Sequence, residues 1–142
     1  DFEHLAKKGQ TIVYQHTGSE SSVCMDENLL RQCVYNLVSN AIKYSGENTL
    51  IECNSQITED HIILQVRDNG IGIPQEDQKH LFELFFRAQN AVNIPGTGLG
   101  LNIVKKYTGM MNGSIEFSSN EVSGTSFKLT FKKVSNESVR TN

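Results

Sequence analysis

The stretch from Glu27 to Tyr44 constrains the fold most, because its apolar residues recur with the period of an α-helix. Asp26 can cap the first turn with its carboxylate, and Gly46 is placed to end the helix in a left-handed turn. At about 100° per residue, one broad arc is formed by Leu30, Val34, Leu37, Val38, Ala41 and Ile42. A helix with such an arc must bury it against a second layer of structure.

The segments around this helix are predicted to be mainly strands. We expect strands at 11–16, 23–25, 49–58 and 61–68, and a C-terminal hairpin of 114–118 and 125–132. In the last strand Phe127, Leu129 and Phe131 alternate with polar residues, the pattern of a strand with one buried face. Further helices are predicted at 75–87 and from about 98 to 111. The chain is long enough for one domain.

Charge and composition exclude several classes of function. The formal net charge is −3, from 13 basic and 16 acidic residues, so we expect no broad basic surface and no nucleic-acid partner. No apolar run is longer than the three residues of Ile62-Ile63-Leu64, so we expect no membrane span and no direct membrane contact. Cys24, Cys33 and Cys53 include no Cys-x-x-Cys pair and are interpreted as reduced thiols of an intracellular protein.

A polar stripe on the first helix is one candidate for chemistry. Asn36, Asn40 and Lys43 lie at i, i+4 and i+7 and therefore share one side of the helix. Asparagine is a mediocre helix former, so two of them in one stripe need an explanation. Amide oxygens beside an ammonium group suit a Mg²⁺ ion that carries phosphates. For these three residues alone, a solvated helix face is the simpler alternative.

Asp68 is a second candidate. It lies on the same strand face as Ile62, Leu64 and Val66, and a buried carboxylate needs hydrogen-bond donors. Two interpretations are open: a turn-forming aspartate at the start of DNGIGIP (68–74), or an acceptor for the exocyclic amine of a flat base, with glycines that let the base approach the backbone. Thr125, at the start of the last strand, is placed to orient this carboxylate or its water.

Two more segments add groups that can bind an anion. The run GTGLGL (96–101) opens a helix and can present free amides, although a flexible loop is the simpler alternative. It has neither the preceding strand of a dinucleotide fingerprint nor the Gly-Lys-Ser/Thr of a P-loop. In LFELFFRA (81–88) phenylalanines at this spacing are most simply core residues, an interpretation that we keep for at least Phe82. Arg87 lies at the edge of an irregular stretch and can reach a phosphate.

These segments, taken in order, resemble the N, G1, F and G2 boxes of sensor histidine kinases: NLVSNAIKYS (36–45), DNGIGIP, LFELFFRA and GTGLGL. The resemblance covers about residues 10–133, and four boxes in the right order make it specific. It implies the Bergerat, or GHKL, ATP-binding fold, an α/β (α+β) two-layer sandwich with a mixed, mostly antiparallel sheet packed on about three helices. It also implies ATP and Mg²⁺ as cofactors.

The resemblance further implies roles at the phosphate end of the nucleotide. Asn40 should ligate Mg²⁺, with Asn36 beside it as a second candidate ligand, and Lys43 should contact phosphate. Arg87 should assist the γ-phosphate when residues 88–98 close as a lid, so these four residues form the expected catalytic group. The phosphates should lie among Gly96, Thr97, Gly98, Leu99, Gly100 and Leu101.

At the adenine end, the resemblance implies that Asp68 accepts a hydrogen bond from the adenine amino group and that Tyr44 stacks near the base. Gly70, Gly72 and Ile73 should shape the base pocket, with Thr125 beside the carboxylate.

A kinase is favoured over the ATP-hydrolysing relatives of the same superfamily. Those clamp proteins resemble one another in a glutamate, four residues before the magnesium asparagine, that serves as general base for water. Here that residue is Asn36, and an amide cannot take a proton at neutral pH. We therefore expect a protein-histidine kinase, the catalytic domain of a two-component signal transduction protein, that transfers the γ-phosphoryl group to a histidine. The alternative is a degenerate nucleotide-binding regulatory module without phosphotransfer.

The phosphoacceptor is expected outside this chain, because none of His4, His16, His61 and His80 lies in the family's acceptor motif. We expect 1–9 to be the end of a preceding dimerisation helix or a linker, 10–133 the catalytic domain and 134–142 a polar tail. The implied partners are the dimerisation domain of a homodimeric parent kinase, which carries the acceptor histidine, and a downstream response regulator. The isolated domain should be a cytoplasmic monomer, even where the parent is anchored in a membrane.

Overall fold

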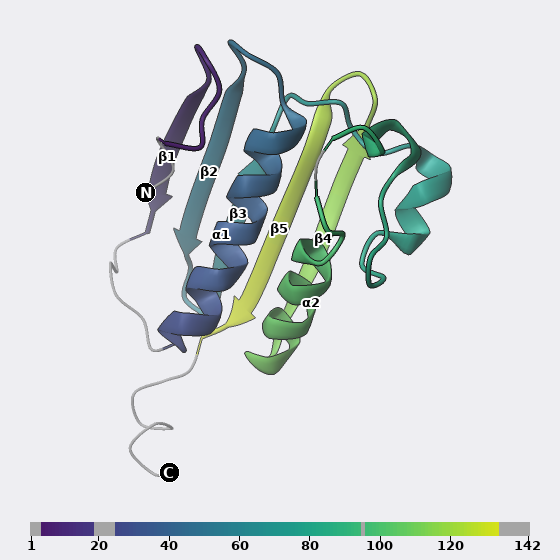
Figure 1. Cartoon of the computed structure of the whole chain (residues 1–142). Helices are drawn as coiled ribbons and strands as arrows, with labels where there is room; N and C mark the ends of the chain where they lie inside the picture. Colours follow the sequence, from purple (N-terminus) through teal and green to yellow (C-terminus); the bar gives the residue numbers. More distant parts are fainter. Residues whose placement is uncertain (1–3, 19–24, 95, 134–142) are drawn as a thin grey trace.

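A mixed sheet forms one layer of the protein, and its α-helices cover one face of that sheet (Figure 1). The computed structural model describes residues 4–18, 25–94 and 96–133. The strands are β1 (Thr11–Thr17), β2 (Leu50–Ile57), β3 (His61–Arg67), β4 (Gly113–Asn120) and β5 (Gly124–Lys132). The α-helices are α1 (Glu27–Tyr44) and α2 (Gly100–Met110), and two short 3-10 helices, η1 (Gln75–His80) and η2 (Gln89–Ala91), precede α2.

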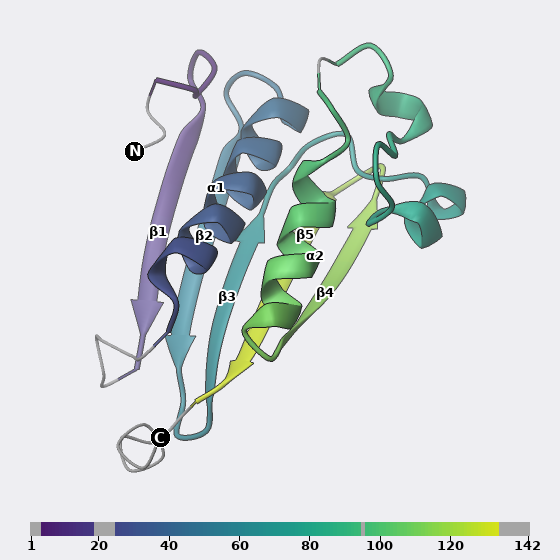
Figure 2. The same cartoon turned by 60° about the horizontal axis from the view of Figure 1, so that its bottom comes forward.

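The strand order is β1-β2-β3-β5-β4. Strands β1 and β2 pair in parallel, as expected for strands joined through a helix, and the other three pairs are antiparallel. The predicted two-layer sandwich with a mixed, mostly antiparallel sheet is therefore confirmed. Figure 2 shows α1 and α2 side by side on the sheet, with the segment between β3 and α2 extending past the sheet at one end.

Helix α1 begins as the sequence predicts and ends in a different way. The Asp26 side chain accepts a hydrogen bond from the Leu29 amide at 3.1 Å. The predicted left-handed turn at Gly46 is wrong, because the φ angle of Gly46 is not positive. Instead, Lys7 Nζ donates to the carbonyls of Lys43 and Ser45 at 2.9 and 2.6 Å. A side chain from the segment before β1 thus satisfies the free carbonyls at the end of the helix.

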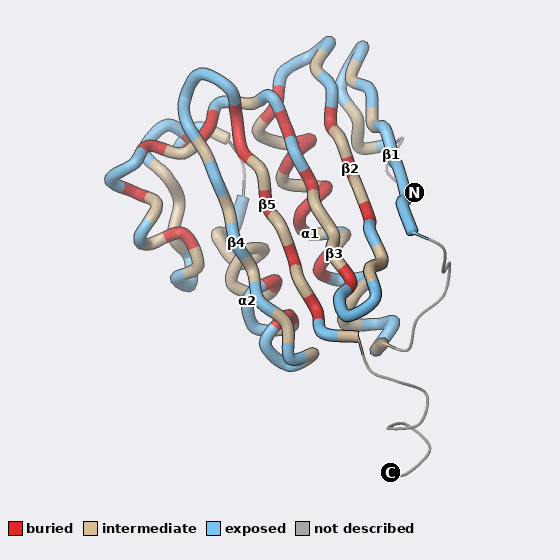
Figure 3. The backbone as a smooth tube through the Cα atoms, turned by 180° about the vertical axis from the view of Figure 1, so that it is seen from behind, coloured by how far each residue is buried: buried red, intermediate tan, exposed pale blue. Residues whose placement is uncertain are grey.

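The core lies between the helices and the sheet. Its fully buried members include Leu37 and Val38 of α1, Val104 of α2, and Leu129 and Phe131 of β5. Seen from the other side of the sheet, exposed residues alternate with half-buried ones along β4, whereas along most of β5 half-buried residues alternate with buried ones (Figure 3). Cys33 and Cys53 are buried free thiols, as expected, and Cys24 lies outside the described residues. No helix in the described parts of the chain has the length and hydrophobicity to cross a membrane.

The predicted helix at 75–87 is wrong beyond its first turns. The segment forms the 3-10 helix η1 and then a series of turns, in which Phe85 has a positive φ of 61°. The phenylalanines are therefore not on one helical face: Phe82 packs against the core, whereas Phe85 is 68% exposed. The helical spacing of the phenylalanines does not predict a helix here, because Phe82 points to the core and Phe85 to solvent.

The ends of the chain lie partly outside the described residues. Residues 4–10 form turns, and residues 1–3 and 134–142 are not described, so the expected domain boundaries stay a prediction. Residues 23 and 24 of the predicted strand 23–25 are also outside, and Met25 is not in a strand.

Candidate functional site

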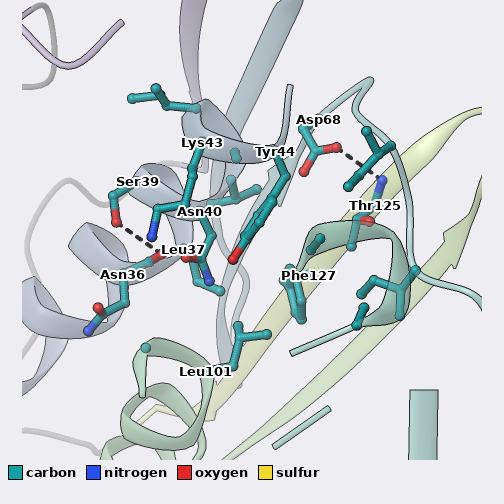
Figure 4. Close-up of a pocket in the computed structure, with 18 of the residues that line it drawn as sticks. Asn36, Leu37, Ser39, Asn40, Lys43, Tyr44, Asp68, Leu101, Thr125 and Phe127 are labelled. Atoms are coloured by element: carbon teal, nitrogen blue, oxygen red, sulfur yellow. Dashed lines mark hydrogen bonds between the residues drawn. The ribbon is translucent and has the colours of Figure 1, made fainter. Parts of the chain in front are cut away.

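A cavity of about 530 Å³ opens between α1, the N-terminus of α2 and the segment that follows β3 (Figure 4). This volume is in the range of small-molecule sites. Of the expected site residues, those that line it are Asn36, Asn40, Lys43, Tyr44, Asp68, Gly72, Ile73, Arg87, Thr97, Gly98, Gly100, Leu101 and Thr125. Gly70, Gly96 and Leu99 are not among the lining residues. Segments far apart in sequence thus meet at one site.

Asp68 is buried at one end of the cavity with a defined orientation. One carboxylate oxygen, Oδ1, accepts hydrogen bonds from the amides of Gly70 at 2.8 Å and Thr125 at 3.2 Å, the second of which is drawn in Figure 4. Among the described residues both donors to this carboxylate reach Oδ1, so Oδ2 stays available to a ligand. Burial raises the pKa of Asp68, and the two backbone hydrogen bonds partly oppose that rise. Asp68 therefore stabilises the turn, as one interpretation predicted, and it also lines the cavity. Its role as an acceptor for a base stays a prediction.

Glycines fix the loop that carries Asp68. Gly72 has a φ of +69°, and a Cβ added there would lie 1.9 Å from the Asn120 carbonyl oxygen. A Cβ at Gly70 would lie 2.3 Å from the carbonyl oxygen of Tyr44. Both contacts are with protein backbone, so close packing of the loop against α1 and β4 already requires these glycines.

The polar stripe of α1 faces the start of α2. Asn36 Nδ2 donates to the Gln32 carbonyl at 2.9 Å, which leaves the amide oxygen Oδ1 free of that bond. A Cβ added at Gly100 would lie 3.3 Å from Asn36 Oδ1 and 3.7 Å from Asn40 Nδ2, so glycine keeps a narrow space open between the two helices. Lys43 Nζ lies beside the loop that precedes α2, where a Cβ added at Gly96 would lie 3.2 Å from it.

This donor set fits a magnesium ion held with a ligand and does not form a metal centre of protein groups alone. The described residues contain no group of three or more His, Cys, Asp or Glu side chains that could hold a metal. Two neutral amides leave most coordination positions to phosphate oxygens and water, which is how Mg²⁺ commonly binds with nucleotides.

The N-terminus of α2 has free amides directed to the same region. Leu99 caps the helix without a side-chain hydrogen bond, and the first turn contains no acidic residue. By contrast, α1 has the Asp26 cap. Uncapped amides at the positive end of a helix dipole form a favourable site for an anion.

Arg87 and Tyr44 both line the cavity. Arg87 Nη2 donates to the Ala91 carbonyl at 2.8 Å, and the buried Nε has no hydrogen-bond partner among the described residues. Burial raises the pKa of the Tyr44 hydroxyl, and the nearby positive charge of Arg87 partly lowers it. A cationic group with an unsatisfied donor is thus positioned beside an aromatic ring.

Comparison with known proteins assigns the family. Residues 25–135 match the family model of histidine kinase-, DNA gyrase B- and HSP90-like ATPases. This chain belongs to that ATPase family. The expectation of an ATP-binding domain of the histidine kinase type is therefore confirmed.

Individual relatives of this ATPase domain are sensor kinases. Sensor histidine kinase YvrG of Bacillus subtilis is 35% identical over 127 residues, which are 89% of this chain and 22% of that protein. Sensor-like histidine kinase SenX3 of Mycolicibacterium smegmatis is 43% identical over 107 residues, 74% of this chain and 28% of that protein. The chain thus spans about a quarter of the length of these curated relatives.

The fold of the ATPase domain is that of histidine kinase catalytic domains. The nucleotide-free catalytic domain of histidine kinase ThkA superposes with a TM-score of 0.76 at 28% identity, covering 88% of this chain and 81% of that one. The predicted fold class and family resemblance are both confirmed.

Several site residues of the ATPase domain were not found from the sequence. Asn90, in a stretch predicted to be irregular, donates from Nδ2 to the Gly72 carbonyl at 3.0 Å and so joins the segment after η1 to the Asp68 loop. Asp77 does not line the cavity itself, but it is buried and accepts from the Gln89 amide at 3.0 Å, which holds the start of η2. Phe127 lines the cavity although its pattern indicates only a core residue. No sequence signal distinguishes these roles, since each depends on a partner from another element.

Proposed function

We propose that this domain binds Mg·ATP in the cavity and transfers the γ-phosphoryl group to a histidine on a dimerisation domain outside the chain. The observation that carries the proposal is the polarity of the cavity. One end presents the Asp68 carboxylate, and the other is bordered by Lys43 and the uncapped start of α2. Arg87 also lines the cavity and adds a positive charge. A ligand with an amine at one end and several negative charges at the other matches this arrangement.

The adenine base would lie at the Asp68 end. Its exocyclic amine would donate to Asp68 Oδ2, because Oδ1 already accepts from Gly70 and Thr125. The half-buried Tyr44 ring, directed into the cavity in Figure 4, offers a face for stacking. Gly72 and Ile73 would border the base on the same loop.

The triphosphate would lie between α1 and the N-terminus of α2. The amides from Gly100 onward and the Lys43 ammonium would contact phosphate oxygens, with Thr97, Gly98 and Leu101 bordering them. Asn40, with Asn36 beside it, would supply amide oxygens to Mg²⁺. The metal would neutralise charge on the β- and γ-phosphates during transfer. The Arg87 guanidinium, whose Nε finds no partner in the described part of the chain, would stabilise the γ-phosphate.

Transfer is favoured over hydrolysis because the chain offers no base at the position that would activate water. Asn36 is neutral, and its amide nitrogen already donates to the Gln32 carbonyl. An imidazole acceptor is its own nucleophile, so the domain needs mainly to position and neutralise the phosphates. The parent kinase would then pass the phosphoryl group to a response regulator.

Two experiments test this function. The first is titration calorimetry with ATP, with and without Mg²⁺. The second is phosphorylation of a separately supplied dimerisation domain. We expect magnesium-dependent binding, slow hydrolysis by the domain alone, and a phosphohistidine on the added domain. Asn40→Ala should weaken the magnesium dependence and leave ADP binding without metal nearly unchanged. Rapid ATP hydrolysis without an acceptor, or no binding of ATP at all, contradicts the proposal.

A further inference from the structure

Asp77 is a buried carboxylate that the proposed nucleotide chemistry does not use. It lies in η1, is 7% exposed, and is not among the residues that line the cavity. Its Oδ2 accepts a hydrogen bond from the Gln89 amide at 3.0 Å, and Gln89 is the first residue of η2. A carboxylate is costly to bury, so one that joins two short helices beside the cavity calls for a functional explanation.

The short helix η2 holds the side chain of Arg87. Arg87 lines the cavity, and its Nη2 donates to the Ala91 carbonyl at 2.8 Å. Ala91 is the last residue of η2, is 6% exposed, and donates its own amide to the Ala88 carbonyl at 3.0 Å. Because η2 is a single tight turn, the position of its first residue, Gln89, sets the position of the carbonyl that receives the guanidinium.

A second hydrogen bond holds η2 from another element. Asn90 Nδ2 donates to the Gly72 carbonyl at 3.0 Å, on the loop that carries Asp68. Asn90 is exposed, whereas the Asp77 carboxylate is buried. A hydrogen bond that is shielded from water is stronger than one that solvent can replace, so Asp77 provides the firmer of the two anchors. The turn that holds Arg87 is therefore fixed mainly from η1.

We propose that Asp77 is a positioning residue, which fixes η2 through the Gln89 amide so that η2 keeps the Arg87 guanidinium ready for the γ-phosphate of ATP. This inference rests on the proposed function, in which Arg87 contacts that phosphate. An arginine side chain that is free to rotate loses conformational entropy when it binds a ligand. An arginine that is already held in the cavity avoids most of this cost. Asp77 thereby contributes to phosphoryl transfer without touching the nucleotide.

ADP separates this role from simple support of the fold, because ADP lacks the phosphate that Arg87 would contact. Dissociation constants for ATP and ADP, both with Mg²⁺, are measured by calorimetry for the wild type, Asp77→Ala, Arg87→Ala and the double variant. Arg87→Ala should raise the ratio of the Kd for ATP to the Kd for ADP by about tenfold or more, the equivalent of one hydrogen bond to a charged group. Asp77→Ala should raise that ratio by about two- to tenfold, the equivalent of one side chain that must be immobilised on binding. The double variant should match Arg87→Ala, because Asp77 acts through the arginine.

Three further variants complete the test. Asp77→Asn keeps an oxygen that can accept from the Gln89 amide, so it should retain the wild-type ratio. Gln89→Ala is the matched control: it removes the exposed hydrogen bond from Gln89 Nε2 to Glu76 Oε1 and keeps the backbone amide, so it should also leave the ratio unchanged. Asp77→Leu fills the same space without an acceptor, and it replaces Asp77→Ala in the comparison if urea unfolding shows that the alanine variant is not folded.

The outcomes separate the inference from the proposed function. If Asp77→Ala leaves both dissociation constants unchanged, weakens both nucleotides equally, or acts as strongly in the Arg87→Ala background as in the wild type, the inference is wrong and the proposed function stands. An unchanged ratio in Arg87→Ala also overturns the inference, because the arginine then does not contact the γ-phosphate. A wild type that binds neither nucleotide contradicts the proposed function itself.

Discussion

Replacing Asp68 by asparagine tests the adenine end of the site with little change in shape. The asparagine oxygen can take the place of Oδ1 and accept from the amides of Gly70 and Thr125. Its Nδ2 then takes the place of Oδ2 and presents a donor where the carboxylate presented an acceptor. The adenine amine would meet another donor, while the loop keeps its hydrogen bonds.

The expected loss follows from the two hydrogen-bonding changes. A hydrogen bond to a charged acceptor contributes about 1.5–3 kcal/mol, and leaving a buried donor without a partner costs about 1–3 kcal/mol. Their sum is about 2.5–6 kcal/mol, which corresponds to a Kd for ATP about 10²- to 10⁴-fold weaker. The fold itself should not lose stability, because burial disfavours the wild-type carboxylate, as its raised pKa shows.

Calorimetry with Mg·ATP and urea unfolding without nucleotide measure the two effects separately. The control is Asp60→Asn, at an exposed aspartate in the turn before β3, at the opposite end of that strand from Asp68. It should leave both quantities unchanged. If Asp68→Asn binds ATP within threefold of the wild type while remaining folded, the carboxylate does not recognise the amine and the placement of adenine is wrong.

Three further predictions address the loops, the core and the effect of pH. Gly98 has a φ of +74° and no room for a Cβ, so Gly98→Ala should lower the unfolding free energy by about 1–3 kcal/mol and weaken ATP binding. Gly109 lies in a helix with open space around it, so Gly109→Ala should raise the unfolding free energy by about 0.5–1 kcal/mol. Unfolding by urea measures both changes. Leu129 is fully buried, so Leu129→Ala should lower the unfolding free energy by about 2–5 kcal/mol. Val122 is 95% exposed, so Val122→Ala should change the unfolding free energy by less than about 0.5 kcal/mol. Equal effects of the two substitutions would contradict the core described above. The pKa of Asp68 is raised in the folded protein above its ordinary value of 3.8, so its stabilising contribution is complete below pH 3.8 and is lost as pH rises through the raised pKa. The unfolding free energy of the wild type relative to Asp68→Asn should therefore fall over that pH interval. A difference that stays flat or rises with pH refutes this prediction.

The sequence determined the elements whose signals are local. The amphipathic period of 27–44 predicted α1, and the Asp26 cap is where the sequence placed it. Alternating residues predicted β5 and the strands before it within one or two residues. These predictions hold because burial of one face imposes a period that can be read along a single element. Most of the candidate site residues line one cavity, which lies where the polar side of α1, the end of β3 and the start of α2 meet.

Tertiary structure alone decided how those residues present their atoms. The donors that occupy Asp68 Oδ1 come from Gly70, two residues away, and from Thr125, which is distant in sequence. The end of α1 is capped by Lys7, and the Thr125 hydroxyl lies 2.8 Å from the hydroxyl of Ser119 on the neighbouring strand. Hydrogen bonds of this kind depend on which elements pack together in space, and no residue pattern within one element records the partner that a second element supplies.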